Sequence, residues 1–191
     1  LPNEQKLRYK AELMKFSKGE ASIIHHELVD LMLENFAMSV TNLNKYLQCP
    51  TRFYFETILK VPAGRNANMG FGSAVHYALE QYFLDFMRTE LKSLPSVNKL
   101  KEYFIKGIEK YHSHFTPKEM EQYKLAGQHQ LEGYHETHHK KWFTPKKYDV
   151  EYSLKNITHR GVELTGKLDR VDYMDDQVIV VDYKTGSYNY A

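Results

Sequence analysis

Residues 162–186 read VELTGKLDRVDYMDDQVIVVDYKTG, and this stretch decides the fold class of the chain. Two runs rich in Val, Ile and Tyr flank the polar pair Asp175-Asp176, a pattern typical of two β-strands joined by a tight turn. Pairing outward from that turn sets Asp169 directly opposite Asp182. The sequence therefore predicts an antiparallel hairpin that carries two facing carboxylates.

Asp169 and Asp182 form the first candidate site. Opposed positions on antiparallel strands bring Cβ atoms to roughly 4.5–5.5 Å, where two like charges destabilise each other unless a cation lies between them. Because side chains alternate along a strand, Lys184 lies on the same face as Asp182. Oxygen ligands suit Mg²⁺ or Mn²⁺, and a nearby lysine stabilises charge that develops on a phosphate. The pattern thus indicates metal-assisted hydrolysis of a phosphodiester.

Two observations bear on this interpretation in opposite directions. Charged residues are common on a solvated hairpin face, where they need no metal. The apolar run Val178–Val181 leads directly into Asp182, however, and predicts a buried strand that ends at a carboxylate. A carboxylate in that position is more often part of a functional site than of a solvated surface.

The residues before this hairpin are predicted to be mainly helical. Thr116-Pro117-Lys118-Glu119 combines an N-cap, a proline at the first helical position and a capping-box glutamate. At Thr144-Pro145 the apolar period changes from helical to extended. The fold class is therefore α/β, with a mainly helical N-terminal two-thirds and an antiparallel three-stranded β meander at the C-terminus. The expected helices cover residues 4–36, 39–55 with a break at Pro50, 73–88, 97–114 and 117–142, and the expected strands are Tyr148–Ile157, Val162–Tyr173 and Val178–Lys184.

Composition limits the class of protein further. Lys and Arg number 26 against 24 Asp and Glu, and a net charge of +2 neither demands nor forbids a polyanionic partner. The 191 residues contain no long uncharged apolar run and no signal-peptide core, which excludes a membrane span and a secretory signal. The single cysteine, Cys49, excludes an internal disulfide and fits a reducing intracellular compartment.

Four stretches, in this order, resemble the PD-(D/E)XK nuclease superfamily, specifically its RecB-like branch with AddB-type and CRISPR-associated nucleases. One pair of aspartates with a lysine is a weak signal, whereas four signatures in the family's order are a strong one. The resemblance spans residues 39–186 and implies a restriction-endonuclease-like core. The four stretches are Ser39–Pro50 with Phe53-Tyr54-Phe55, Gly72–Glu80 around His76, Gly166–Asp172, and Asp182–Gly186.

The resemblance implies a role for each matching residue. Asp169 and Asp182 match carboxylate ligands of a Mg²⁺ or Mn²⁺ ion, and the backbone carbonyl of Tyr183 matches a further oxygen ligand. His76 matches a nitrogen ligand, although a histidine on an aromatic helix is by itself more often a packed or surface residue. Lys184 matches the catalytic lysine.

Further residues are candidates for roles around this site. Glu80 lies one helical turn after His76 and can orient it or a metal-bound water, but it is equally consistent with a plain surface residue. Arg52 and Arg170 are candidate phosphate contacts. The densest basic patch is interleaved with aromatic residues and suits a DNA backbone, or else it is a helix C-terminus that favours cations through its dipole. Its lysines are Lys140, Lys141, Lys146 and Lys147.

The chain departs from the family's pattern in two ways. Members usually carry a Gln-x-x-x-Tyr motif on a helix after the third strand, and the sequence ends at Ala191 before any such helix. Many members also hold a 4Fe-4S cluster through four cysteines, but only Cys49 is present here, so no cluster is expected and Cys49 is interpreted as a small buried residue.

The start at Leu1 and the end at Ala191 predict a piece of a longer polypeptide. In this interpretation residues 1–38 are a helical lead-in from an upstream region. Residues 39–191 are a RecB-like nuclease domain that is incomplete at its C-terminus and carries a helical insert at about residues 90–145.

These features predict a metal-dependent DNA nuclease, an exonuclease module for DNA end processing, recombination and repair. The resemblance implies linear DNA or single-stranded ends as the substrate, an upstream helicase region or helicase subunit as a partner, and the bacterial cytoplasm as the location, without membrane association. The alternative is a catalytically inactive nuclease-like domain that acts as a DNA-binding or protein-interaction scaffold. A helical interaction module with a β tail is a third option, but it leaves the facing carboxylates unexplained.

Overall fold

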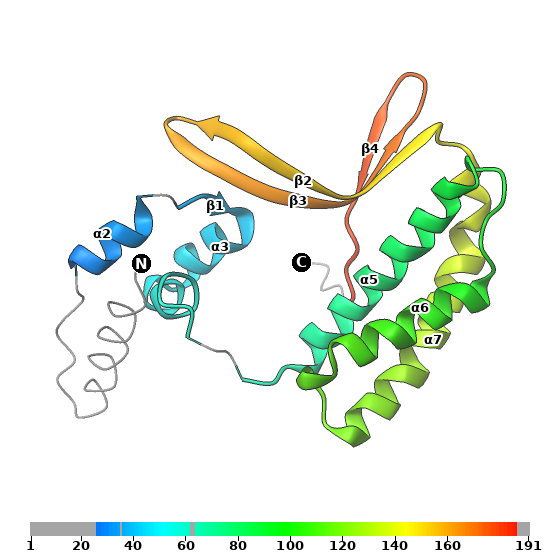
Figure 1. Cartoon of the computed structure of the whole chain (residues 1–191), viewed down its shortest axis with the longest axis horizontal. Helices are drawn as coiled ribbons and strands as arrows, with labels where there is room; N and C mark the ends of the chain where they lie inside the picture. Colours follow the sequence, from blue (N-terminus) through cyan, green and yellow to red (C-terminus); the bar gives the residue numbers. More distant parts are fainter. Residues whose placement is uncertain (1–25, 35, 62–63, 187–191) are drawn as a thin grey trace.

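Two groups of helices are connected by a long β-ribbon in the computed structural model, which describes residues 26–34, 36–61 and 64–186 (Figure 1). Of the helix predicted over residues 4–36, residues 4–25 lie outside the described residues, and the described part contains a helix at His26–Leu33. The N-terminal group contains α2 (His26–Leu33), α3 (Val40–Gln48), α4 (Pro50–Phe53) and a π-helical turn at Tyr54–Ile58. The second group contains α5 (Ala67–Arg88), α6 (Val97–Lys110) and α7 (Pro117–His138), and the strands are β1 (Met38–Ser39), β2 (Lys147–His159), β3 (Val162–Tyr173) and β4 (Val178–Val181).

Helix α5 is the centre of the second group. The side chain of Asn66 caps its start by accepting a hydrogen bond from a backbone N–H of the first turn at 3.1 Å. The helix thus begins earlier than the predicted Ser73, because Gly70 lies within it rather than in a loop. A Cβ added at Gly70 would lie 2.6 Å from the Cβ of His114, so close packing requires glycine there.

The hydrophobic core lies between α5, α6 and α7 and extends to the start of β2. Aromatic side chains dominate it, and the rings of Phe83 on α5 and Tyr148 on β2 lie 5.2 Å apart between centroids. This packing anchors α5 to the sheet and therefore fixes the direction in which its remaining face points. The largest fully buried side chains are Tyr82, Tyr148, Phe83, Phe86, Phe104, Leu100 and Ile108.

The two helices that cover α5 begin at the caps that their sequences provide. Thr116 and Glu119 form the predicted reciprocal capping box at the start of α7, and Ser96 caps α6. Both helices end earlier than predicted, and each is followed by a 3₁₀ turn, at His112–His114 and His139–Phe143. No helix in the described part of the chain is long and apolar enough to cross a membrane.

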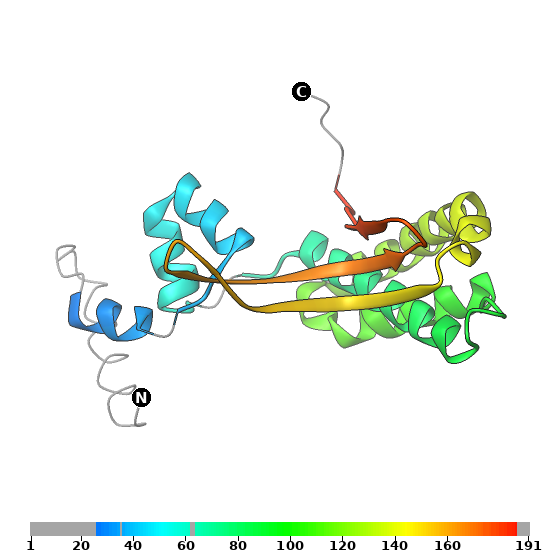
Figure 2. The same ribbon diagram turned by 90° about the horizontal axis from the view of Figure 1, so that it is seen from above.

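The sheet has four strands, and β3 is its central strand (Figure 2). Along one edge β3 pairs antiparallel with β2, and along the other it pairs antiparallel with β4 and parallel with β1. The predicted antiparallel meander is confirmed, and so is the predicted register of its second hairpin. The strand β1 was not predicted, because two residues carry no periodicity. The β3–β4 pairs are Arg170↔Val181, Val171↔Val180, Asp172↔Ile179 and Tyr173↔Val178.

Strand β4 differs from the prediction in burial and in length. Val178, Ile179 and Val180 are 58%, 38% and 54% exposed, so the expectation of a buried strand was wrong. The physical reason is that β4 pairs with β3 on one side only and is an edge strand. Its pairing stops at Val181, and Asp182–Lys184 therefore lie beyond the ladder rather than within a strand.

Replacing Gly107 of α6 with alanine should destabilise the fold. The new Cβ would lie 2.8 Å from the carbonyl oxygen of Ala74. Ala74 lies within α5, so this contact can be relieved only if the backbone of α5 moves. We expect the free energy of unfolding to fall by about 1–3 kcal/mol, as measured by urea denaturation. Gly133→Ala in α7 is the matched control, since its Cβ would meet open space and alanine favours a helix by about 1 kcal/mol. Equal stability of the two variants would contradict close packing of α5 on α6.

Candidate metal centre

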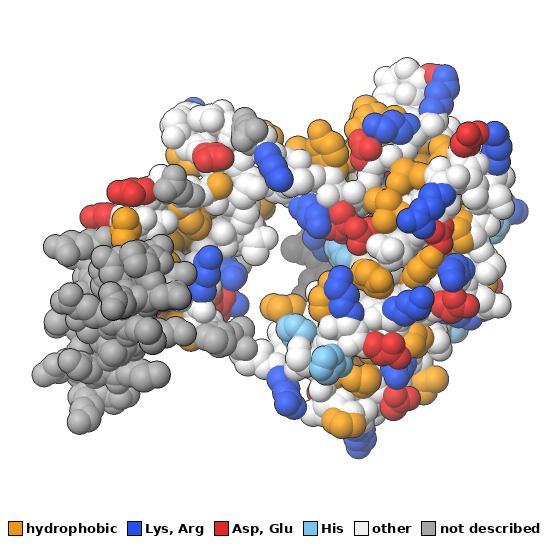
Figure 3. Space-filling model, viewed as in Figure 1, with side chains coloured by type: hydrophobic (Ala, Val, Ile, Leu, Met, Phe, Trp, Pro, Cys, Tyr) orange, Lys and Arg blue, Asp and Glu red, His pale blue; other side chains and the backbone are white. Residues whose placement is uncertain are grey.

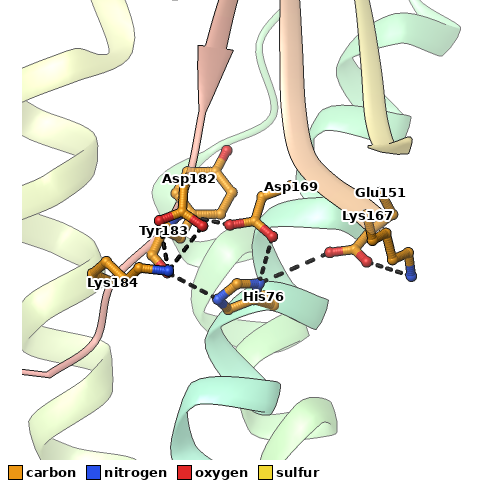
Figure 4. Close-up of polar contacts among 7 residues, drawn as sticks. All are labelled: His76, Glu151, Lys167, Asp169, Asp182, Tyr183 and Lys184. Atoms are coloured by element: carbon orange, nitrogen blue, oxygen red, sulfur yellow. Dashed lines mark hydrogen bonds and ion pairs between the residues drawn. The ribbon is translucent and has the colours of Figure 1, made fainter. Parts of the chain in front are cut away.

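Three side chains from three elements converge where α5 approaches the sheet (Figure 4). His76 comes from α5, Glu151 from β2 and Asp169 from β3, and all three are partly buried. Each offers a ligand atom within 4.8 Å of the other two, and among the described residues this is the one such group of His, Cys, Asp and Glu side chains. One helix and two strands thus bring a nitrogen and two carboxylates to one point.

The imidazole of His76 is oriented by contacts at both of its nitrogens. Nε2 lies 3.1 Å from the backbone carbonyl oxygen of Tyr183, which can only accept, so Nε2 carries the proton in this hydrogen bond. Nδ1 lies 3.2 Å from Oδ1 of Asp169 and 3.9 Å from Oε1 of Glu151. A histidine whose outer nitrogen donates to a carbonyl presents the other nitrogen to a metal, and here Nδ1 faces both carboxylates.

Asp169 also contacts the segment that follows β4. Its Oδ2 accepts a hydrogen bond from the backbone N–H of Tyr183 at 2.6 Å. This bond, rather than a strand pair with Asp182, holds the segment against β3. Tyr183 therefore contacts two of the predicted ligands through its backbone, His76 through the carbonyl and Asp169 through the N–H.

Glu151 was missed by the sequence analysis. The register of β2 on β3, Val150↔Arg170 and Tyr152↔Leu168, places Glu151 beside Asp169. Its backbone φ is 50°, a left-handed conformation that residues other than glycine rarely adopt. Such outliers concentrate at functional sites, where the surrounding structure holds them in place. The unusual backbone conformation of Glu151 and the position of its carboxylate thus both indicate a functional site here.

Asp182 and Lys184 lie outside this group and pair with each other. The Lys184 ammonium lies 2.6 Å from Oδ2 of Asp182, and their side chains are 62% and 59% exposed. The structure thus brings together His76 and Asp169 from the predicted ligand set, and it adds Glu151. The carbonyl of Tyr183 accepts from His76, and Asp182 points toward Lys184 (Figure 4).

The donor set of this group fits a divalent cation. Two carboxylates close to one imidazole carry more negative charge than their protein neighbours cancel, and a cation between them relieves the repulsion. Lys167 compensates part of this charge by pairing with Glu151 at 2.5 Å. That hydrogen bond raises the pKa of Lys167, although partial burial opposes the rise. Nitrogen with oxygen ligands suits Mn²⁺, and oxygen ligands suit Mg²⁺.

Different faces of α5 border two cavities at this site. The first has a volume of about 480 Å³ and opens between α5, the end of α6 and the strands β2 and β3. It includes His76, Glu151 and Glu80, and the charge of Glu80 helps to raise the pKa of Lys167. The second, of about 630 Å³, lies between α7 and residues 181–186 and includes Asp182 and Lys184. The metal centre is therefore reachable by a ligand of small-molecule size.

Arg170 lies in the interior and is not available for the predicted phosphate contact. It is 5% exposed, and its Nε and Nη2 donate to the two carboxylate oxygens of Asp172 at 2.7 and 2.9 Å. Its Nη1 donates to the Tyr183 hydroxyl at 3.1 Å, and its guanidinium stacks 4.4 Å from the Phe83 ring centroid. Arg170 points to the face opposite Asp169 because side chains alternate along β3. Through its hydrogen bond to the Tyr183 hydroxyl, Arg170 holds the segment after β4 from the face of β3 opposite Asp169.

Burial shapes the charge states around Arg170. Burial raises the pKa of the Tyr183 phenol, which keeps it protonated. Burial also opposes the charge on Arg170, but the hydrogen-bonded carboxylate of Asp172 holds the pKa of Arg170 above its ordinary value. The guanidinium and its carboxylate thus form a fully paired buried group.

The other predicted DNA contacts do not line either cavity. Arg52 pairs with Glu56 at 2.8 Å in the N-terminal helical group. Lys146 pairs with Asp175. These basic residues are exposed, so they remain candidates for contacts outside the metal centre. The four lysines near the start of β2 are Lys140, Lys141, Lys146 and Lys147.

Cys49 is exposed, so its interpretation as a buried residue was wrong. It is the N-cap of α4, and its Sγ accepts a hydrogen bond from the backbone N–H of Arg52 at 3.4 Å. Pro50 follows at the first helical position, where its missing N–H costs nothing. The cysteine thus ends one helix and starts the next.

Comparison with known proteins agrees with this fold and identifies the family of the chain. A family model described as the PD-(D/E)XK nuclease superfamily matches residues 37–191, which include β1, all three residues of the metal centre and the segment after β4. The chain therefore belongs to the PD-(D/E)XK nuclease superfamily. Its mixed α/β architecture is consistent with a restriction-endonuclease-like core. Searches of curated proteins and of solved structures found no match.

Replacing Asp172 with alanine should strongly destabilise the chain. The buried guanidinium of Arg170 would lose both carboxylate acceptors, and an uncompensated buried charge costs about 3–5 kcal/mol. Chemical denaturation measures the loss directly. Glu102→Ala is the matched control, since its pair with Lys99 is solvent-exposed and worth less than about 1 kcal/mol. Equally small losses in both variants would contradict the buried position of Arg170.

Proposed function

We propose that the chain is a divalent-metal-dependent DNA nuclease whose cation is held by His76, Glu151 and Asp169. The convergence of these three side chains within 4.8 Å carries the proposal. Membership of the PD-(D/E)XK nuclease superfamily supplies the reaction class, hydrolysis of a phosphodiester. The ion is Mg²⁺ or Mn²⁺, since carboxylate oxygens suit both and the imidazole nitrogen favours Mn²⁺.

Each residue has a distinct task in this proposal. A bound divalent cation polarises the phosphate and makes water an effective nucleophile at neutral pH. Nδ1 of His76 and one oxygen each of Glu151 and Asp169 hold the cation, while the hydrogen bond from Nε2 to Tyr183 keeps the ring oriented. The pair of carboxylates thus acts by fixing the position of positive charge.

Lys184 is the proposed catalytic lysine. It follows Tyr183, whose backbone is tied to Asp169 at 2.6 Å, so its position relative to the cation is set by that hydrogen bond. Its ammonium stabilises phosphate oxygens that gain charge in the transition state. Asp182 orients this ammonium through an ion pair at 2.6 Å. Asp182 also remains a candidate ligand of the cation, in addition to His76, Glu151 and Asp169.

The finer assignment follows the sequence motifs. The histidine motif around His76 and the segment Asp182–Gly186 resemble those of the RecB-like branch, with AddB-type nucleases. On this basis we assign the chain to exonucleolytic processing of DNA ends in recombination and repair. A helicase region or subunit is the proposed partner, in the cytoplasm of a bacterium. No 4Fe-4S cluster enters the proposal, because Cys49 is the only cysteine of the sequence.

One observation favours the second candidate function, an inactive scaffold. Lys184 and Asp182 neutralise each other, and Asp182 does not join the group at His76. In the scaffold function the lysine stays paired in this way, and the domain binds nucleic acid without hydrolysing it. The same assay distinguishes the two functions.

The assay incubates the protein with linear single- and double-stranded DNA and Mn²⁺ or Mg²⁺. We expect degradation that stops in EDTA and falls by at least about 100-fold in Asp169→Ala and in Lys184→Ala, because the first removes a ligand of the cation and the second removes the ammonium that stabilises charge in the transition state. Asp176→Ala in the β3–β4 turn is the control and should leave the rate unchanged. Degradation that persists in both site variants would overturn the proposed site, and DNA binding without degradation would establish the scaffold.

A further inference from the structure

The first cavity beside the metal centre contains aromatic and basic residues that the proposed reaction does not use. His76 and Glu151 form part of its wall, so a ligand in the cavity lies next to the proposed cation. Its volume of about 480 Å³ falls in the range of small-molecule sites, roughly 300–1,000 Å³. The complete lining is Gly72, Ser73, His76, Tyr77, Glu80, Lys110, Tyr111, Glu151 and Lys167.

The aromatic residues of this cavity are Tyr77 on α5 and Tyr111 at the end of α6. Both rings are partly exposed. The ammonium of Lys110 lies 4.6 Å from the Tyr77 ring centroid and 5.3 Å from that of Tyr111, so one cation stands against both rings. Small residues, Gly72 and Ser73, occupy the same face of α5 and leave the cavity open. Two aromatic faces with a cation between them suit a base and its phosphate.

The charges of the cavity point to an anionic ligand once a cation is bound. Its two lysines, Lys110 and Lys167, are matched by its two glutamates, Glu80 and Glu151. A divalent cation at His76 then leaves an excess of positive charge. Lys110 and Lys167 come from α6 and β3, so the two ammonium groups belong to different elements that border the cavity.

Figure 3 shows the molecule hollowed between the N-terminal helical group and the side where α5 and α6 lie. The cavity is bordered by residues of α5 and of the end of α6.

We propose that this cavity binds an unpaired nucleotide next to the reacting phosphate, with its base on Tyr77 and Tyr111 and its phosphate on Lys110, so that the substrate is single-stranded DNA. The inference rests on the proposed nuclease function and specifies its substrate. Bases in a duplex are covered by their stacked neighbours, whereas an unpaired base exposes a face to an aromatic side chain.

Binding is measured by fluorescence anisotropy with a labelled oligothymidylate and with a duplex of equal length, in Ca²⁺, and cleavage of the single strand is measured in parallel in Mn²⁺. The parent protein should bind the single strand more tightly than the duplex. Tyr111→Ala and Lys110→Gln should each weaken single-strand binding by about tenfold, and Tyr111→Phe should restore it because the ring is kept. Thermal melting confirms that each variant is folded.

Two matched controls lie outside the cavity. Lys106→Gln removes an exposed lysine of α6 that stands against another ring, Tyr103, and Tyr152→Ala removes an exposed tyrosine of β2. Both should bind like the parent protein. Unchanged binding in Tyr111→Ala and Lys110→Gln, or equal binding of duplex and single strand, would overturn the inference.

The two readouts separate this inference from the proposed function. The expected binding pattern without cleavage would support the nucleotide site and contradict hydrolysis. Cleavage that is insensitive to Tyr111→Ala and Lys110→Gln would support hydrolysis and contradict the nucleotide site. Neither binding nor cleavage of the oligothymidylate would overturn both.

Discussion

Asp169 holds the site together because its two carboxylate oxygens contact different parts of the fold. One oxygen faces Nδ1 of His76 on α5 at 3.2 Å, and the other accepts from the backbone N–H of Tyr183 at 2.6 Å. A single side chain on the central strand thus joins the helical group, the sheet and the segment that carries Lys184. The bond from the Tyr183 N–H to this carboxylate is a charge-assisted hydrogen bond, which is stronger than a neutral one, whereas the oxygen that faces the unprotonated Nδ1 is left for a cation. The metal centre and the position of Lys184 therefore depend on the same carboxylate.

Much of the fold could be predicted because its signals are local. The capping box at Thr116 and Glu119 starts α7 as expected, and the turn at Asp175-Asp176 sets the observed register of β3 and β4. What could not be predicted depends on tertiary contacts. Gly70 looks like a loop residue until its packing against His114 is known, and the exposure of Val178–Val181 follows from the edge position of β4.

The site was predictable only in part, because a register shift between β2 and β3 determines whether Glu151 lies in it. If pairing ran without interruption from the turn at Arg160-Gly161, Glu151 would lie opposite Arg170 and point to the other face. The register shift between Leu154 and Ile157 changes the pairing by one residue and brings Glu151 beside Asp169. Since strand side chains alternate, one residue reverses the face. No glycine of β2 marks the shift, and the glycine that borders it, Gly166, lies on the partner strand opposite Leu154. The sequence motifs, by contrast, placed His76 and Asp169 in one site, and their side chains lie 3.2 Å apart in the fold.

The central claim is that His76, Glu151 and Asp169 form the metal centre. The most direct measurement is the anomalous scattering of Mn²⁺ in crystals of the protein grown with that ion. We expect a peak within bonding distance of Nδ1 of His76 and of one carboxylate oxygen each from Glu151 and Asp169. A peak bound by Asp182 without Glu151, or no peak at His76, would contradict this claim.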